Sequence, residues 1–343
     1  MTGVGIWFSA SLVNPTSIAS LLRVFFWAWF VEWLCFVTEV ILILYYYLTW
    51  DSWVGDRKKA HVRLGFNLAL TSWLTMVIIV AILAFMMDPG NWLSQKTFLR
   101  GFLNPIYLPQ LAFRTPLAMV MAAGAAFGVI FFSNFAPSQE KKAVRLFSRW
   151  ILFWLPFLGL GGFWYLSAIP ESMRANMNVA LTTQEFTSWY QGVTYTIVLS
   201  VILIAAFAFK GAITSRVPKF LMLAPFLICV VFMGQFERSR EFIRKPYAIG
   251  GYLYANGFRK DDYALLNRDG ILKHAPYVSI REITEANAVK AGEEVFLLAC
   301  TRCHTVSGMN SIVDKLTGMY GSTTWSKATT SSPLAALSGS SPS

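Results

Sequence analysis

Six stretches of about 20 apolar residues recur along the chain, and no other feature restricts its fold as strongly. An α-helix needs roughly 20 apolar residues to cross a bilayer, so each stretch has the length of one membrane span. Charged residues make up only 14% of the chain, which is low for a soluble domain. The sequence therefore predicts an all-α membrane helical bundle of about six transmembrane helices, near 24–50, 64–87, 115–135, 150–168, 190–209 and 220–236.

The basic residues of the chain are concentrated between these stretches. The net charge is +11, but no basic stripe with interleaved aromatic residues occurs, so nucleic acid is not an expected partner. The connections 51–63, 137–149 and 210–219 hold eleven Lys and Arg, against four in 88–114 and 169–189. Because basic loops stay in the cytoplasm, we expect a multi-pass protein of a bacterial inner membrane. Both ends are then on the outer, periplasmic side of the lipid bilayer.

The pattern Cys-x-x-Cys-His occurs at Cys300, Cys303 and His304. Two thiols at this spacing can each bond one vinyl group of the same porphyrin, and the adjacent His then lies beneath the iron as an axial ligand. This is the attachment pattern of haem c. A thioredoxin-like dithiol and half of a zinc site share the Cys-x-x-Cys spacing. The dithiol does not need His304, and zinc lacks further ligands, because the other histidines are His61 and His274 and no cysteine follows.

The stretch before this motif, Ala291 to Phe296, resembles the first helix of small class I cytochromes c. Those proteins supply a methionine as the sixth iron ligand, from a loop well downstream of the motif. Here the downstream methionines are Met309 and Met319, both close to His304. The candidates for the sixth ligand are therefore Met309, Met319 and the upstream His274.

Composition divides the chain into four segments. Residues 1–236 form the predicted bundle. From 237 charged residues are frequent and Pro and Gly interrupt any long helix, so 237–290 is predicted to be a polar connecting segment. Residues 291–320 are predicted to be a truncated, cytochrome c-like haem-binding segment outside the membrane. Residues 321–343 are mostly Ser, Thr, Ala, Gly and Pro, which is typical of a disordered tail.

Two acidic residues lie within the first apolar stretch, where charge is costly and usually functional. Glu32 and Glu39 are seven residues apart, which places both on one face of a helix. Two acids on one face favour a proton path or a contact with a haem. In the structural alternative, Glu32 pairs with Arg23 or with a partner subunit.

Near residue 240 the chain contains Glu241, followed by Arg244-Lys245-Pro246-Tyr247 and Ala248-Ile249-Gly250. This segment resembles a motif of subunit I of the cytochrome bd quinol oxidases. In that motif a Glu is followed after two residues by Arg, Gln or Lys, Pro, Trp or Tyr, and then Ala-Ile-Gly. The family's Glu ligates a high-spin b haem near the outer face. The resemblance implies that Glu241 ligates a haem b and that Arg244 supports it.

The resemblance extends over most of the chain, but with departures. The match begins after the helix that carries a histidine ligand in the family, so the family's N-terminal helices are expected to be missing. Arg114 stands where the family has the histidine of its low-spin b haem. The acidic Gly-Asp-Glu-Ser signature of the family's quinol loop is absent from 169–189. The matching residues are Thr2-Gly3-Val4, Asn14-Pro15, Glu32, Glu39, Trp50-Asp51 and, as in a branch with a C-terminal cytochrome c domain, Leu103-Asn104-Pro105 and Arg114-Thr115.

Two functions fit these patterns. The first is a membrane haem protein that passes electrons between quinone, a haem in the bundle and the outer haem c of a respiratory chain. Its partners would be other membrane redox subunits and c-type cytochromes. The second is a non-catalytic membrane subunit that anchors a haem c as an electron wire in a larger complex. His61 falls in a predicted connection and is expected to be solvated, so oxygen reduction by this chain alone is not expected.

Overall fold

The structure is a computed structural model that describes residues 8, 11–12, 15–174, 186–275, 277–301, 304–306 and 311–312. It describes the backbone alone for residues 186–191, 193–194, 238–239 and 241–242. The fold separates into two compact units. We call Leu21–Lys245 the membrane unit, and Pro246–Ser343 together with Met1–Ser20 the C-terminal unit.

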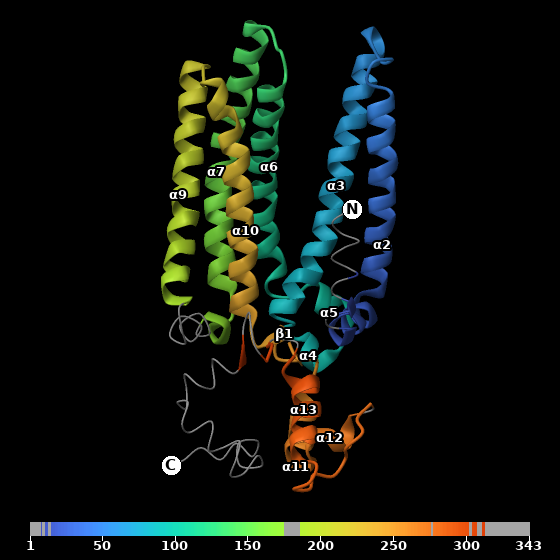
Figure 1. The fold of residues 1–343 in the computed structure, drawn as a ribbon. Helices are drawn as coiled ribbons and strands as arrows, with labels where there is room; N and C mark the ends of the chain where they lie inside the picture. The colour runs from blue at the N-terminus through green and yellow to red at the C-terminus, as the bar shows by residue number, and fades with distance from the viewer. Residues whose placement is uncertain are drawn as a thin grey trace. The chain divides into compact units, whose positions relative to one another are not determined.

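The predicted spans are confirmed as helices. In the part of the chain that the structure describes, six helices are long and apolar enough to cross a membrane, which is the architecture of a multi-pass membrane protein. The helices that begin at Lys58 and Pro137 start well before their apolar stretches, because the basic residues ahead of each stretch are also helical. The long helices are α2 (Pro15–Leu48), α3 (Lys58–Met87), α6 (Tyr107–Phe132), α7 (Pro137–Ala168), α9 (Phe186–Thr214) and α10 (Ala224–Arg244), with η1 (Gly55–Arg57), α4 (Trp92–Gln95), α5 (Phe98–Phe102) and η2 (Lys219–Leu223) between them (Figure 1).

Helix α2 packs on α3 through one stripe of side chains. Phe25 departs from helical backbone angles (φ −115°, ψ 26°), and its fully buried ring lies against Phe85 with 4.8 Å between the ring centroids. Further along the stripe, the Ser72 hydroxyl of α3 donates to Glu39 Oε1 at 2.7 Å. Between these two contacts the less exposed residues of α2 include Ala28, Glu32 and Cys35, so the stripe from Phe25 to Glu39 has spacings of three and four residues.

Helices α6, α7, α9 and α10 lie side by side and share one core (Figure 1). Glycines allow two of their contacts to be very close. A Cβ added at Gly161 of α7 would lie 2.4 Å from the Ala112 carbonyl oxygen of α6, and one at Gly211 of α9 would lie 2.2 Å from Ser148 Oγ of α7. Small residues serve this purpose in membrane helices because tight packing, rather than exclusion from water, holds them together. Fully buried members of the core include Phe127, Ile151 and Met222.

The connection from α3 to α6 is held against α3 by a buried amide. Asn104 Nδ2 donates to the carbonyl oxygens of Ala81 and Gly101, both at 2.9 Å. Gly90 has a φ of +54°, and a Cβ there would lie 2.6 Å from Pro105 Cδ, so only glycine fits. The Asn104-Pro105 pair therefore belongs to the turn that sets where α6 begins.

The C-terminal unit begins with a short hairpin, which the all-α prediction did not include. Strand β1 (Tyr247–Ile249) pairs antiparallel with β2 (Leu253–Tyr254). Tyr247 lies opposite Tyr254, and their rings stack with 4.7 Å between centroids. Part of the predicted connecting segment 237–290 is therefore regular structure. The elements that follow are η3 (Lys260–Asp262), α11 (Tyr263–Asp269), α12 (Ile271–His274) and α13 (Ala288–Ala299).

Candidate functional site

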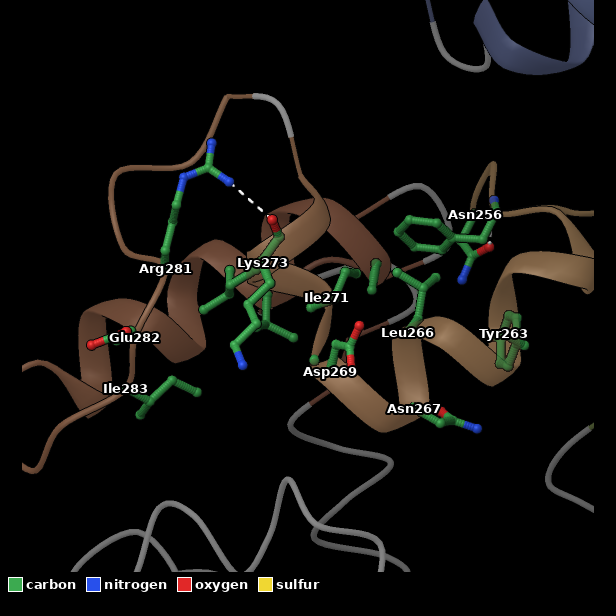
Figure 2. Close-up of a pocket in the computed structure, with 15 residues that line it drawn as sticks. Asn256, Tyr263, Leu266, Asn267, Asp269, Ile271, Lys273, Arg281, Glu282 and Ile283 are labelled. Atoms are coloured by element: carbon green, nitrogen blue, oxygen red, sulfur yellow. Dashed lines mark hydrogen bonds between the residues drawn. The ribbon is translucent and has the colours of Figure 1, made fainter.

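A cavity of about 1070 Å³ lies in the C-terminal unit, between α11, α12 and α13 (Figure 2). Ala299, the last residue of α13, lines it and directly precedes Cys300. Small-molecule pockets measure roughly 300–1,000 Å³ and are mainly apolar with a few polar groups. The less exposed lining residues are mostly apolar and include Phe258, Leu266, Ile271, Leu272, Val295 and Ala299. The exposed rim includes Asn267, Lys273, Arg281 and Glu282.

Hydrogen bonds on both sides fix the rim segment 279–283. Arg281 Nη1 donates to the Lys273 carbonyl oxygen of α12 at 2.9 Å (Figure 2). On the other side, the Glu294 carboxylate of α13 accepts the Ser279 hydroxyl and two backbone N–H groups, each at 3.2 Å. The Ser279 bond, more than the backbone bonds, lowers the pKa of Glu294 by stabilising its ionised form. The segment is therefore attached to two helices that line the cavity.

The carboxylate of Asp269 also lies at the rim, and it is already engaged. Arg268 Nε donates to Asp269 Oδ1 at 2.8 Å, and His274 Nε2 lies 3.0 Å from Oδ2. The Arg268 bond and then the His274 bond hold the pKa of Asp269 well below its usual range. His274, a candidate sixth ligand, is therefore held through Nε2 and is not one of the residues that line the cavity.

The described part of the Cys-x-x-Cys-His motif lies at the end of α13. The His304 N–H donates to the Cys300 carbonyl oxygen at 2.9 Å, which ties the two described ends of the motif together. Cys300 and His304 are both partly buried. Cys303, Met309 and Met319 lie outside the described residues. Within the described residues, no group of three or more His, Cys, Asp and Glu side chains could hold a metal ion. A c-type haem does not need such a group, because the porphyrin supplies most of the iron's ligands.

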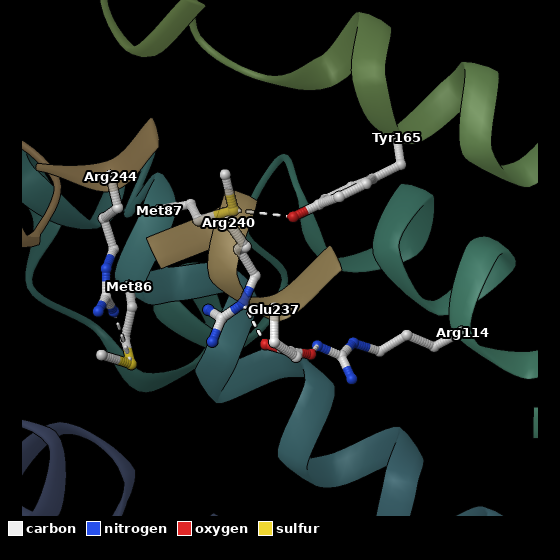
Figure 3. Close-up of polar contacts among 7 residues, drawn as sticks. All are labelled: Met86, Met87, Arg114, Tyr165, Glu237, Arg240 and Arg244. Atoms are coloured by element: carbon white, nitrogen blue, oxygen red, sulfur yellow. Dashed lines mark hydrogen bonds and ion pairs between the residues drawn. The ribbon is translucent and has the colours of Figure 1, made fainter. Parts of the chain in front are cut away.

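A second polar site lies in the membrane unit, where α6 and α10 meet (Figure 3). Glu237 of α10 accepts Arg114 Nη2 of α6 on one carboxylate oxygen, and Arg240 Nε on the other at 2.8 Å. The arginine side chains are only 13% and 11% exposed. Removing one partner of a buried ion pair is strongly destabilising, because it leaves a charge without compensation. Glu237 therefore joins α6 to α10.

Two donors at this second site have methionine sulfur as their acceptor (Figure 3). The Tyr165 hydroxyl of α7 donates to Met87 Sδ at 2.9 Å, and Arg244 Nη1 donates to Met86 Sδ at 3.4 Å. A thioether is a weak acceptor. Arg114, Arg240 and Arg244 thus place three guanidinium groups near the Glu237 carboxylate (Figure 3).

The second site contains part of the motif that resembles the cytochrome bd family. Arg244, which is 6% exposed, is one residue of that motif. Glu241, the implied haem b ligand, lies in α10 one turn after Glu237, but its side chain is outside the described residues. Arg114, which the resemblance would place at the position of a histidine, forms an ion pair with Glu237. Sequence reasoning did not single out Glu237 or Arg240, although their spacing of three residues on one helix was an available signal.

The two acids of α2 lie on its less exposed side. Both Glu32 and Glu39 are partly buried, and Glu39 is bonded to Ser72 of α3. Among the described ion pairs there is none between Glu32 and Arg23, so the structure does not contain that alternative.

The expectation for His61 was wrong. It is 7% exposed rather than solvated, and it lies in the first turn of α3 rather than in a connection. Its ring stacks on Tyr46 with 4.1 Å between centroids, and Nε2 lies 3.0 Å from the Tyr46 carbonyl oxygen. Trp50 and Trp53 present their rings edge-on to it. These aromatic residues, close to His61 in the sequence, were a signal for burial.

No protein-family model, curated protein or solved structure matches the chain.

Proposed function

We propose that this chain is a membrane-anchored c-type haem protein that transfers electrons in a respiratory chain. The position of the cavity is the main support, because Ala299 lines it and the Cys-x-x-Cys-His pattern begins at the next residue. Among the described residues of that pattern, Cys300 and His304 lie beside the cavity lining rather than in it. A porphyrin is flat and largely apolar, with carboxylates along one edge. The apolar interior and polar rim of the cavity suit that shape and chemistry. A haem held there supplies iron that takes up and releases one electron at a time.

Each residue of the motif has one role in this proposal. Cys300 and Cys303 hold the porphyrin through thioether bonds, and His304 binds the iron. The sixth ligand is one of Met309, Met319 and His274. His274 would have to give up its Asp269 bond at Nε2 or bind through Nδ1, because one ring nitrogen cannot serve both partners.

The proposed location is a bacterial inner membrane, with the C-terminal unit on the periplasmic side. The supporting observation is the excess of Lys and Arg in connections 51–63, 137–149 and 210–219. Haem c is attached on the outer side of such a membrane, so the charge pattern and the haem motif agree.

For the membrane unit we propose the relationship to subunit I of the cytochrome bd quinol oxidases. Glu241 would ligate a haem b with Arg244 beside it, membrane quinol would be oxidised to quinone as it donates electrons, and Glu32 and Glu39 would form a proton path. Oxygen reduction by this chain alone is not part of the proposal. A low-spin relay haem needs strong axial ligands, and His61 is engaged with Tyr46. Partner redox subunits would supply the missing histidines.

The first test is covalent haem on the purified chain, made in cells with working haem-attachment machinery. On a denaturing gel stained for haem peroxidase activity, we expect the wild-type band to stain. The double variant Cys300→Ala/Cys303→Ala should not stain, because both thioether bonds are lost. Cys35→Ala removes a lone cysteine of α2 and should stain like the wild type. An unstained wild-type band would rule out the proposal.

A pyridine haemochrome spectrum of the same samples separates the two versions of this function, because it reports haem c and haem b independently. Haem b that is lost in Glu241→Ala, with haem c unchanged, would support the relationship to the bd oxidases. A wild-type chain that holds haem c alone, even with its natural partners, would favour the non-catalytic electron wire.

A further inference from the structure

Helix α12 contributes both apolar residues and a charged residue to the lining of the cavity. Ile271 and Leu272 are among its less exposed, apolar lining residues, and Lys273 follows on the exposed rim. The Lys273 backbone is fixed, because its carbonyl oxygen accepts the Arg281 bond at 2.9 Å. In Figure 2 the Lys273 side chain extends away from that carbonyl. The Lys273 side chain therefore starts from a fixed backbone position beside the apolar lining of the cavity.

Lys273 forms no ion pair with a carboxylate among the described residues. Asp269, which shares the rim, already accepts bonds from Arg268 and His274. Glu294 is bonded to the rim segment at Ser279. The rim thus has a cation next to an apolar cavity. Of the two acids that line the cavity, Asp269 is bonded to other groups, and Glu282 forms no ion pair with Lys273 among the described residues.

We infer that Lys273 binds a carboxylate of the ligand that fills the cavity, which under the proposed function is a propionate of the haem. A carboxylate buried without a partner is costly, so a ligand with an apolar body and a charged edge places that edge at the rim. Lysine is a compact charge with three donors and can follow a propionate through small shifts of its flexible stem. Residues upstream of the motif therefore provide both a wall and an anchor for the ligand.

The electrostatic consequence is a change in the reduction potential. Ferrous haem carries one positive charge fewer than ferric haem, so a nearby cation stabilises the reduced form. Removing Lys273 leaves the propionate without its partner and should lower the midpoint potential. It should also move the pH dependence of that potential, because a propionate without a cation binds a proton more readily.

The test is a spectroelectrochemical titration of the full-length chain at several pH values. For Lys273→Gln we expect the reduction equilibrium to shift about tenfold toward the oxidised form, or about 59 mV for one electron. Haem staining and the visible spectrum should be unchanged. Lys273→Arg keeps the charge and should match the wild type. Lys260→Gln removes an exposed cation of the same unit that does not line the cavity, and it should also match the wild type.

Each other outcome has a definite meaning. An unchanged potential in Lys273→Gln would overturn the inference while leaving the proposed function intact, whereas a wild-type chain without haem would overturn the proposed function itself. A change to a high-spin spectrum would also overturn the inference, because the amine would then be an iron ligand. If Lys273→Gln fails to take up haem, normal haem and potential in Lys273→Arg would support the role of the charge. Failure of both variants would overturn it.

Discussion

Glu294 and Asn287 each make several hydrogen bonds that hold the rim of the cavity in place. Glu294 accepts bonds from the segment at Ser279. Asn287 Oδ1 accepts the Thr284 N–H at 2.8 Å, and its Nδ2 donates to the Glu282 carbonyl oxygen at 3.0 Å. Side chains of this type substitute for the regular backbone bonds that a turn lacks. The shape of the rim therefore depends on individual residues.

Glu294 should make the rim sensitive to acid. Its pKa is lowered by the Ser279 bond, so its contribution to stability is complete above the ordinary carboxyl pKa and is lost as pH falls through the lowered value. In the wild type, protection of segment 279–283 from hydrogen exchange should therefore decrease over that acidic range. Glu294→Gln has no charge to lose, so its protection should be low already at neutral pH and change little on acidification.

Hydrogen exchange followed by mass spectrometry, corrected for the intrinsic effect of pH, checks this prediction. Glu293→Gln is the matched control, because Glu293 is an exposed neighbour on the same helix and should leave the wild-type profile unchanged. Identical pH profiles for Glu294→Gln and the wild type would contradict the assigned role of the carboxylate.

The sequence predicted some of these residues and missed others for a physical reason. The Cys-x-x-Cys-His pattern is recognisable because it is defined by the local spacing from Cys300 to His304. The Glu237 ion pair with Arg114 is not local, since helix packing brings together residues far apart in the chain. The partners of a buried charge cannot be read from one sequence unless they lie on the same helix, as Arg240 does.

At the scale of helices, the contact between α6 and α7 depends on a missing side chain. Gly161→Ala would place a Cβ against the Ala112 carbonyl oxygen, which is backbone and cannot move aside alone. Overpacking of this kind costs about 1–3 kcal/mol, so the thermal unfolding midpoint in detergent, followed by tryptophan fluorescence, should fall. Gly159→Ala lies on the same helix with nothing within 4 Å, so its midpoint should match or exceed that of the wild type. Equal losses in the two variants would show that helix contact is not the cause.

Helices were predicted well where one physical property decides them. Apolar length alone located the six long helices among the described residues that could cross a bilayer, because crossing requires that length. The start of α3 at Lys58 was placed too late, because a basic first turn is hydrophilic but still helical. The walls of the cavity were missed because their apolar residues are spread over two short helices and turns, with no sustained period. Phe258, Leu266 and Ile283 are examples.

The charge pattern predicts on which side of the membrane each connection lies. Lys58→Cys should resist an impermeant maleimide in intact cells, whereas Lys260→Cys should react. Both are measured as the increase over the parent chain, which has cysteines of its own. The reason is that basic connections remain cytoplasmic. Reaction at position 58 but not at 260 would reverse the proposed orientation.

The order of the cavity residues along the chain has a consequence for how the site is made. All the described residues that line the cavity, from Asn256 to Ala299, precede Cys300. A chain emerges from the ribosome with its N-terminus first, and the segments that emerge first can begin to fold first. The described part of the cavity lining is therefore synthesised before Cys300 and Cys303. Under the proposed function, the segment that lines the cavity is already synthesised when the cofactor is attached to Cys300 and Cys303.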